Sequence, residues 1–228
     1  YYNKQIQYLR RHREDALIGF LREDHALRPR IVDPTLKTSE ALVYHLSHIA
    51  AWEAASKENF ASFDSVVEFG GGYGGFTRLI NRLQKNSGTI VVVDFTQMLR
   101  LNFYYLCELG LRDRVHVVSE DGGAPQRSKI NLVPISFAES LSKVRELEPE
   151  MMVATWSLSE ASKNTQNVIK NLEFFGSKRI LYGYHAVAND LIPNTESMAF
   201  PGYVSIYEGA THFSKDSMEK YNFMLLDE

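Results

Sequence analysis

The chain has little of several features that would assign it to a particular protein class. Its 228 residues include a single cysteine, Cys107, which excludes an internal disulfide and leaves no second thiol for a metal site. No apolar run approaches the roughly 18 residues that a membrane helix needs, and residues 1–13 are polar and aromatic, unlike a signal peptide. We therefore expect a reducing, cytoplasmic location and no membrane association. Because the first residue is Tyr1 rather than methionine, we expect a leader to be missing.

An excess of positive charge is also missing. Lysine and arginine total 25 against 28 acidic residues, so the formal net charge is −3 at pH 7. Without a global positive field, sequence-independent binding of phosphates is not expected, and nucleic acid is not a predicted partner. The content of hydrophobic residues, 44%, is sufficient for one sizeable core at this length.

Residues 1–61 are predicted to form a helical extension or lid. Apolar residues recur with a broken helical period over residues 5–24, and two prolines then interrupt the pattern. A second helix is predicted to begin at Thr38 or Ser39, either of which can cap free amides, and to run to about Phe60.

The main domain, residues 62–228, alternates short β-rich runs with helical ones. This alternation favours an α/β fold with a mostly parallel sheet and helices on both faces, because parallel strands need crossover connections. Strands are expected at residues 65–69, 89–95, 115–119, 130–135, 151–156, 179–184, 204–207 and 222–226, and helices at 76–84, 97–109, 137–147 and 165–175. The strand-like runs 115–119 and 130–135 have no helix between them, so either they form a hairpin or one of them is a loop.

The most informative segment is the run E-F-G-G-G-Y-G-G-F at residues 68–76, between a predicted strand and a predicted helix. Glycines let the backbone turn tightly and approach a ligand, and the start of the following helix offers free N–H groups. A glycine-rich surface turn is the competing interpretation. Five glycines in six positions at such a junction favour a ligand site.

Two ligand classes compete for this loop. Gly70, Gly72 and Gly75 satisfy the dinucleotide fingerprint G-x-G-x-x-G. Asp94 stands 19 residues after Gly75, where a carboxylate can accept the ribose hydroxyls of NAD or of S-adenosylmethionine (SAM). Glu68 distinguishes the two ligand classes, because a carboxylate two positions before Gly70 attracts the ammonium and sulfonium groups of SAM but repels the pyrophosphate of NAD. SAM is therefore favoured, with an NAD(P)-dependent oxidoreductase as the alternative.

The run E-F-G-G-G-Y-G resembles the E/D-x-G-x-G-x-G motif of class I SAM-dependent methyltransferases, in which an acidic residue such as Asp94 ends the next strand. More narrowly, E-F-G-G-G-Y-G-G-F-T-R-L, I-V-V-V-D-F, N-F-Y-Y-L, L-V-P and T-W-S-L-S-E look like segments of bacterial sugar O-methyltransferases. The resemblance covers residues 64–226. It implies a Rossmann-like, mostly parallel seven-stranded sheet whose last strand, residues 222–226, is antiparallel.

The same resemblance implies a cofactor site. The glycine loop would surround the methionine part of SAM, Asp94 would hold the ribose, and residues after the third strand would flank adenine. Glu120, Asp121, Ser136 and Phe137 compete for the adenine contact. The implied cofactor-binding residues are Glu68, Gly70, Gly71, Gly72, Tyr73, Gly74, Asp94, Phe95, Ser136, Phe137 and Thr155.

The methyl acceptor is expected beyond two later strands, because ligands of open α/β sheets collect outside the carboxyl ends of the strands. The polar residues that follow the runs 151–156 and 179–184 are Ser157, Ser159, Glu160, His185 and Asp190. His185 is the first candidate for a general base, since a neutral imidazole titrates near working pH; a structural histidine is the alternative. Glu160 is the second catalytic candidate, with contact to substrate favoured over a role as base.

Two further groups have competing interpretations. His45 and His48 share a helical face without a third ligand, so a solvent-facing or lid role is expected and no metal is predicted. Four late aromatic residues form either a sugar platform or part of the core: Phe200, Tyr203, Tyr207 and Phe213.

The sequence thus predicts a methyltransferase that transfers a methyl group from SAM to an oxygen of a small acceptor, a sugar or sugar nucleotide. A homo-oligomer is compatible with this prediction. A catalytically inactive binding subunit with the same fold is the non-enzyme alternative, against which intact Gly70, Gly72, Gly74 and Asp94 argue.

Overall fold

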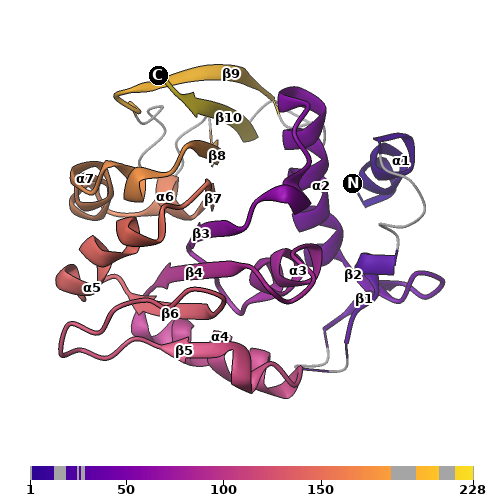
Figure 1. Ribbon diagram of the computed structural model, residues 1–228. Coiled ribbons are helices and arrows are strands. Elements are labelled where there is room, and N and C mark those ends of the chain that lie inside the picture. Colours follow the sequence, from indigo (N-terminus) through magenta and orange to yellow (C-terminus); the bar gives the residue numbers. More distant parts are fainter. Residues whose placement is uncertain are drawn as a thin grey trace.

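The computed structural model describes residues 2–12, 19–24, 26, 29–185, 199–210 and 219–227. Within these ranges, eight strands form one sheet in the order β5-β6-β4-β3-β7-β8-β10-β9, from the lower end of the view to the upper end in Figure 1. The strands are β3 (Ser65–Phe69), β4 (Thr89–Asp94), β5 (Val115–Val117), β6 (Ile130–Pro134), β7 (Met151–Thr155), β8 (Arg179–His185), β9 (Tyr203–Ala210) and β10 (Glu219–Leu226).

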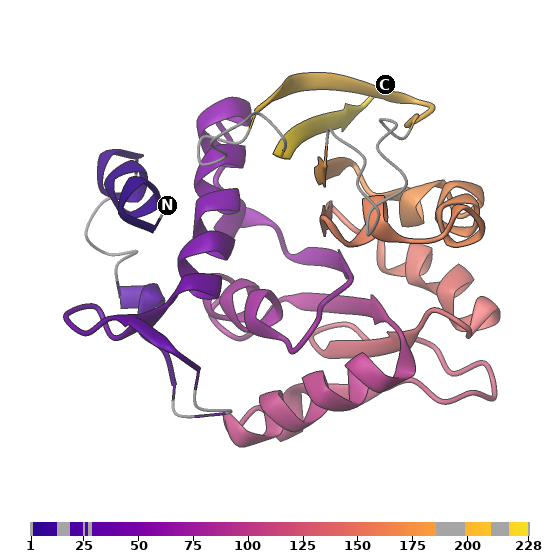
Figure 2. The same ribbon diagram turned by 180° about the vertical axis from the view of Figure 1, so that it is seen from behind.

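Helices cover both faces of the sheet. One hydrophobic cluster joins it to α1, α2, α3 and α4, and a second joins it to α5, α6 and α7. Figure 2 shows α4 running along the β5 end of the sheet. The bounds are α1 (Tyr2–His12), α2 (Glu40–Ser56), α3 (Gly75–Leu83), α4 (Thr96–Glu108), α5 (Ala138–Lys143), α6 (Ser157–Glu160) and α7 (Lys163–Asn171). Each described helix is too short or too polar to cross a lipid bilayer.

The strand directions confirm a mostly parallel sheet in which β10 is antiparallel to both β8 and β9. The sheet has one strand more than the seven expected, because both β5 and β6 belong to it. These two strands run parallel, so the hairpin and loop interpretations are both wrong. An irregular crossover joins them. Buried Asn131 holds this crossover in place: its Oδ1 accepts from the N–H of Gln126 at 2.7 Å, and its Nδ2 donates to the carbonyls of Gln126 and Ile90.

The N-terminal region differs from the prediction. Of the helix expected over residues 5–24, the described part comprises α1 up to His12, and residues 22–24 are not helical. A two-stranded antiparallel ribbon, β1 (Ile31–Asp33) and β2 (Thr38–Ser39), precedes α2. The carboxylate of Asp33 closes the ribbon by accepting from two backbone N–H groups of the turn, at 2.8 and 2.9 Å. The predicted cap at Ser39 is confirmed, since its hydroxyl accepts from the N–H of Leu42 at 3.1 Å.

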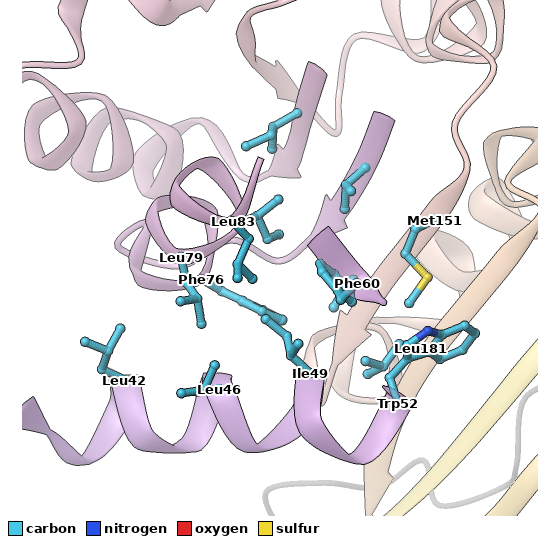
Figure 3. Packing of buried hydrophobic residues seen from close by; sticks show 14 of the residues in the cluster. Leu42, Leu46, Ile49, Trp52, Phe60, Phe76, Leu79, Leu83, Met151 and Leu181 are labelled. Atoms are coloured by element: carbon cyan, nitrogen blue, oxygen red, sulfur yellow. The ribbon is translucent and has the colours of Figure 1, made fainter. Parts of the chain in front are cut away.

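Helix α2 belongs to the main core. Its apolar side chains face α3 and the strands, as Figure 3 shows for Leu42, Leu46, Ile49 and Trp52. The Trp52 ring lies 6.4 Å from that of Phe63, just before β3, whereas Tyr44 lies 4.9 Å from Trp156, just after β7. The helix therefore runs antiparallel to the parallel strands, and its first half lies at their carboxyl ends.

A buried ion pair attaches residues 19–24 to α3. Arg78 is 1% exposed, and its Nη1 lies 2.8 Å from Oε2 of Glu23. Its Nη2 lies 2.5 Å from Asp24 and donates to the carbonyl of Arg22 at 2.7 Å. The hydroxyl of Ser39 donates to the other oxygen of Glu23. This network links the start of α2 to the helix that follows the glycine loop.

We expect Arg78→Met to lower the free energy of unfolding by about 3–5 kcal/mol, because it leaves the Glu23 carboxylate buried without its partner. Urea denaturation would measure the loss. The matched control is Arg127→Met, whose pair with Glu148 is 3.9 Å long between side chains that are 63% and 82% exposed. Arg127→Met should lower the free energy of unfolding by less than about 0.5 kcal/mol. Equal losses for the two variants would contradict a structural role for the Arg78 pair.

Candidate functional site

The chain turns sharply at the end of β3, and only glycine fits at the turn. Gly70 has a φ of +79°, and its N–H donates to the carbonyl of Val93 at 2.8 Å. A Cβ added at Gly70 would lie 2.1 Å from Cβ of Ser157. One added at Gly71 would lie 2.4 Å from Cγ1 of Val92. The absent side chains therefore let β3 approach both the next strand and the turn after β7.

The loop then leads into α3. Gly74, with a φ of +102°, is the residue before the helix, and its carbonyl accepts from the N–H of Arg78 at 2.9 Å. The N–H of Gly74 donates to Gly71 at 2.9 Å. The first N–H groups of a helix lack partners within the helix, so the start of α3 favours a negatively charged or hydrogen-bond-accepting ligand.

Glu68 lies on β3 beneath this loop. It is buried, and its Oε2 accepts from the hydroxyl of Thr77 at 2.5 Å. Burial raises the pKa of Glu68 to about 7; the Thr77 hydrogen bond opposes this shift, and the charge of Asp94 adds to it. A cationic ligand group would stabilise the ionised form of this carboxyl.

Asp94 ends β4 and is fixed relative to the loop. Its Oδ2 accepts from the N–H of Gly72 at 3.0 Å, and its Oδ1 accepts from the N–H of Phe95 at 2.7 Å. Burial raises the pKa of Asp94, while these two backbone hydrogen bonds lower it. The parallel pairing of β3 and β4 thus brings the predicted acidic residue beside the glycine turn.

A cavity of about 380 Å³ opens at this edge of the sheet. Six residues named from the sequence line it: Gly70, Gly72, Asp94 and Phe95 of the expected cofactor site, and Ser157 and Glu160 of the group expected near the acceptor. The other lining residues are Phe69, Met98, Ile135, Ala161, Ser162 and Thr165. Among them, Ile135 directly follows β6, so its place at the end of a strand could have indicated it, whereas Met98 lies in the first turn of α4. Ala161, Ser162 and Thr165, which follow α6, carried no such signal, because their position depends on the turn at Trp156.

Several predicted residues lie elsewhere. The Tyr73 ring packs against Tyr105 at 5.2 Å and folds over Gly75 rather than lining the cavity. Ser136 is exposed. Phe137 lines a second, apolar cavity of about 360 Å³ beside α4, together with Glu120. Thr155 pairs with β8 in the sheet and is not part of the lining.

The two catalytic candidates contact each other. Nε2 of His185, at the end of β8, lies 3.1 Å from Oε1 of Glu160, at the end of α6. A carboxylate at Nε2 favours the tautomer with its proton on that nitrogen, which leaves Nδ1 as an acceptor. Asp190 lies outside the described residues.

The histidines of α2 are placed differently from the prediction. His48 is fully buried, and its Nδ1 is hydrogen-bonded to the Tyr221 hydroxyl, so the solvent-facing interpretation is wrong for it. His45 stacks on Phe76 with ring centroids 5.0 Å apart. Burial lowers the pKa of His45 to about 4 and that of His48 well below its usual value. In the described part of the chain, no group of three or more His, Cys, Asp or Glu side chains is arranged to hold a metal ion.

The late aromatic residues pack against the rest of the protein. Phe200 and Tyr203 contact the buried Phe174 ring at 4.8 and 5.6 Å. Tyr207 stacks on Phe223 at 5.3 Å. The core interpretation therefore holds for these three; Phe213 lies outside the described residues.

The buried carboxyl makes stability depend on pH. The folded protein binds the Glu68 proton more tightly than the unfolded chain, so this contribution to stability is present below about pH 4.5 and is lost as the pH rises through about 7. Glu68→Gln keeps a neutral side chain of the same shape. Relative to this variant, we expect the wild type to lose on the order of 2–3 kcal/mol between about pH 5 and about pH 8. Denaturation over this range would measure it, and parallel pH profiles would refute it.

The glycine turn allows a second test. Gly70→Ala should destabilise the protein far more than Gly110→Ala, because both positions have positive φ but a Cβ at Gly110 meets no atom within 4 Å. Left-handed backbone alone costs about 1–2 kcal/mol for alanine. Adding Ser157→Gly should recover part of the Gly70→Ala loss. Thermal denaturation of the variants would measure these effects, and equal losses at the two glycines would contradict the close contact.

No protein-family profile and no curated protein matches the chain. Its fold is similar to that of the methyltransferase domain of bacterial CtHen1-C, with a TM-score of 0.52 and 13% identity over 80% of this chain and 100% of that one. It is also similar to magnesium protoporphyrin IX methyltransferase (ChlM) from Synechocystis PCC 6803, with a TM-score of 0.50 and 8% identity over 98% and 97% of the two chains. For the mitomycin 7-O-methyltransferase MmcR the TM-score is 0.49 and the identity 10% over 86% of this chain, which spans 58% of that chain. The similarities to the CtHen1-C domain and to ChlM confirm the predicted Rossmann-like methyltransferase fold.

Proposed function

We propose that the protein is a SAM-dependent methyltransferase that methylates an oxygen of a small acceptor, a sugar or sugar nucleotide. The observation that carries this proposal is the pair of acidic side chains on either side of the glycine turn. Glu68 lies beneath the loop, and Asp94 lies in the wall of the cavity. ChlM, which shares the fold, was crystallised with SAM.

The residues present suit SAM. The cavity has the size of a small-molecule site. Asp94 would accept the ribose hydroxyls, and the 59% exposed ring of Phe95 offers adenine a surface to stack on. Glu68 would supply negative charge on the methionine side. Among the described lining residues there is no lysine or arginine to neutralise a pyrophosphate, which argues against the NAD(P)-dependent oxidoreductase.

The chain's own residues would then orient the acceptor and remove its proton. When bound, SAM would supply a methyl group carried on a sulfonium. The acceptor oxygen would form a bond to the methyl carbon as the carbon–sulfur bond breaks, and the electron pair of the broken bond would stay on sulfur. Glu160 would hold the Nε2–H of His185, so that Nδ1 faces the acceptor and takes the proton of its hydroxyl. Glu160 is thus a positioning residue in this scheme. A cytoplasmic location and assembly as a homo-oligomer are consistent with such an enzyme.

Isothermal titration calorimetry with SAM, S-adenosylhomocysteine (SAH) and NAD tests the proposal. We expect saturable binding of both sulfur ligands to the wild type and no binding of NAD. Asp94→Ala should weaken binding by about tenfold or more, because it removes an ionised hydrogen-bond acceptor. Asp113→Ala, which changes an exposed residue outside the cavity lining, is the control.

The other outcomes separate the alternatives. Binding of NAD alone would overturn the proposal and favour the oxidoreductase. Tight binding of SAM without turnover of any acceptor would favour the inactive binding subunit.

A further inference from the structure

A second group of side chains gathers at the same edge of the sheet, apart from the described cavity lining. It consists of five residues, which we call the aromatic cluster: Tyr44 and His48 of α2, Trp156 after β7, His185 of β8 and Tyr221 of β10. The Trp156 ring is central, with its centroid 4.9 Å from Tyr44 and 4.7 Å from His48. His185 and Tyr221 each lie 6.3 Å from it.

Trp156 is held by a backbone conformation that tryptophan rarely adopts. Its φ is 62° and its ψ is −31°, in the left-handed region. Its N–H donates to the carbonyl of Gly183 at 2.8 Å, and its ring passes over the same glycine, where a Cβ would lie 3.6 Å from the indole. The next residue, Ser157, lines the cavity and donates its hydroxyl to the carbonyl of Phe69. The indole is therefore fixed beside the proposed cofactor site, where strained residues often have a function.

The cluster contains buried polar atoms without a partner. Among the described residues, neither Nε1 of Trp156 nor Nε2 of His48 has a hydrogen-bond partner. Nδ1 of His48 is hydrogen-bonded to the Tyr221 hydroxyl, which fixes the orientation of the imidazole. Buried polar groups normally have partners, so these two atoms are candidates for contact with a ligand.

The cluster is open on one side and is bordered by a carboxylate. Tyr44, Trp156 and His185 are each half-buried, whereas His48 and Tyr221 are fully buried and close the inner end. Burial lowers the pKa of His48, so its imidazole is neutral. Among the described residues, no lysine or arginine stacks on the Trp156 ring. The carboxylate of Glu160 lies beside His185, so an anionic group bound here would face a negative charge.

We propose that the aromatic cluster is the acceptor side of the site and binds an uncharged ring that carries hydroxyl groups. Trp156 provides the stacking surface, and ligand hydroxyls bond to its Nε1 and to Nε2 of His48. This inference rests on the proposed function, since it assigns the other reactant of the same transfer. A charged part of the acceptor, such as a diphosphate, lies outside the cluster.

Saturation-transfer difference NMR on the SAH-loaded protein tests this inference with two matched pairs of probes. One pair is methyl β-glucoside and methyl β-glucuronide, and the other is catechol and 2,3-dihydroxybenzoate. We expect the neutral member of at least one pair to bind, and its charged counterpart to give a signal at least about fivefold weaker. The pair that responds distinguishes a sugar from an aromatic acceptor.

Three variants locate the binding. Trp156→Ala should abolish the signal of the neutral probe, and Tyr221→Phe, which removes only the hydroxyl that orients His48, should weaken it. Trp52→Phe is the control, because the second of the two tryptophans is buried near the opposite ends of the strands. Calorimetry with SAH and thermal denaturation would verify that each variant is folded and loaded.

The possible failures are distinguishable. If SAH does not bind to the wild type, the proposed function is wrong. If SAH binds but neither neutral probe does, or the charged probes bind equally well, the inference about the acceptor is wrong. Unchanged probe binding in folded Trp156→Ala and Tyr221→Phe would also overturn it.

Discussion

The candidate site depends on one close contact, the approach of Gly70 to Ser157. Because Gly70 has no side chain, the end of β3 can lie directly against the turn that follows β7. That contact brings together two segments 87 positions apart in the chain and aligns the glycine loop with α6. Asp94 then joins the loop through the N–H of Gly72. The cavity, the position of Asp94 in its lining and the position of α6 all depend on a turn at Gly70 that has no room for a Cβ.

Helix α2 gives the site its second half. It packs antiparallel to the strands, so one end contributes Trp52 to the core and the other places Tyr44 and His48 beside Trp156. The segment predicted as a lid therefore shares the hydrophobic core of the sheet. The buried pair between Arg78 and Glu23 ties the same region to α3. A proposed cofactor side built on β3 and β4 and a proposed acceptor side built on α2 thus rest on one core.

Much of the fold could be predicted because buried parallel strands are continuous apolar runs. The run at residues 65–69 predicted β3 with both bounds right, and the residue types narrowed the cap of α2 to Thr38 or Ser39, of which Ser39 is the cap. The ribbon at residues 31–39 was missed, since its strands are short and a single carboxylate closes its turn. The direction of β5 was also missed, because the crossover before β6 is held by the buried amide of Asn131 rather than by a helix.

The α/β class, the glycine loop and the acidic residues at positions 68 and 94 could be recognised in the sequence, because they depend on local patterns and on a spacing between adjacent strands. Which side chains meet across the sheet depends on how the elements pack and could not be recognised in this way. In the folded protein, His185 contacts Glu160, Tyr73 packs against Tyr105 outside the cavity lining, and His48 is buried against Tyr221. Such contacts join residues that are distant in the chain, and their formation depends on the direction of α2 and on the turn at Trp156. Neither feature has a local sequence pattern, because both follow from how helices and strands pack together.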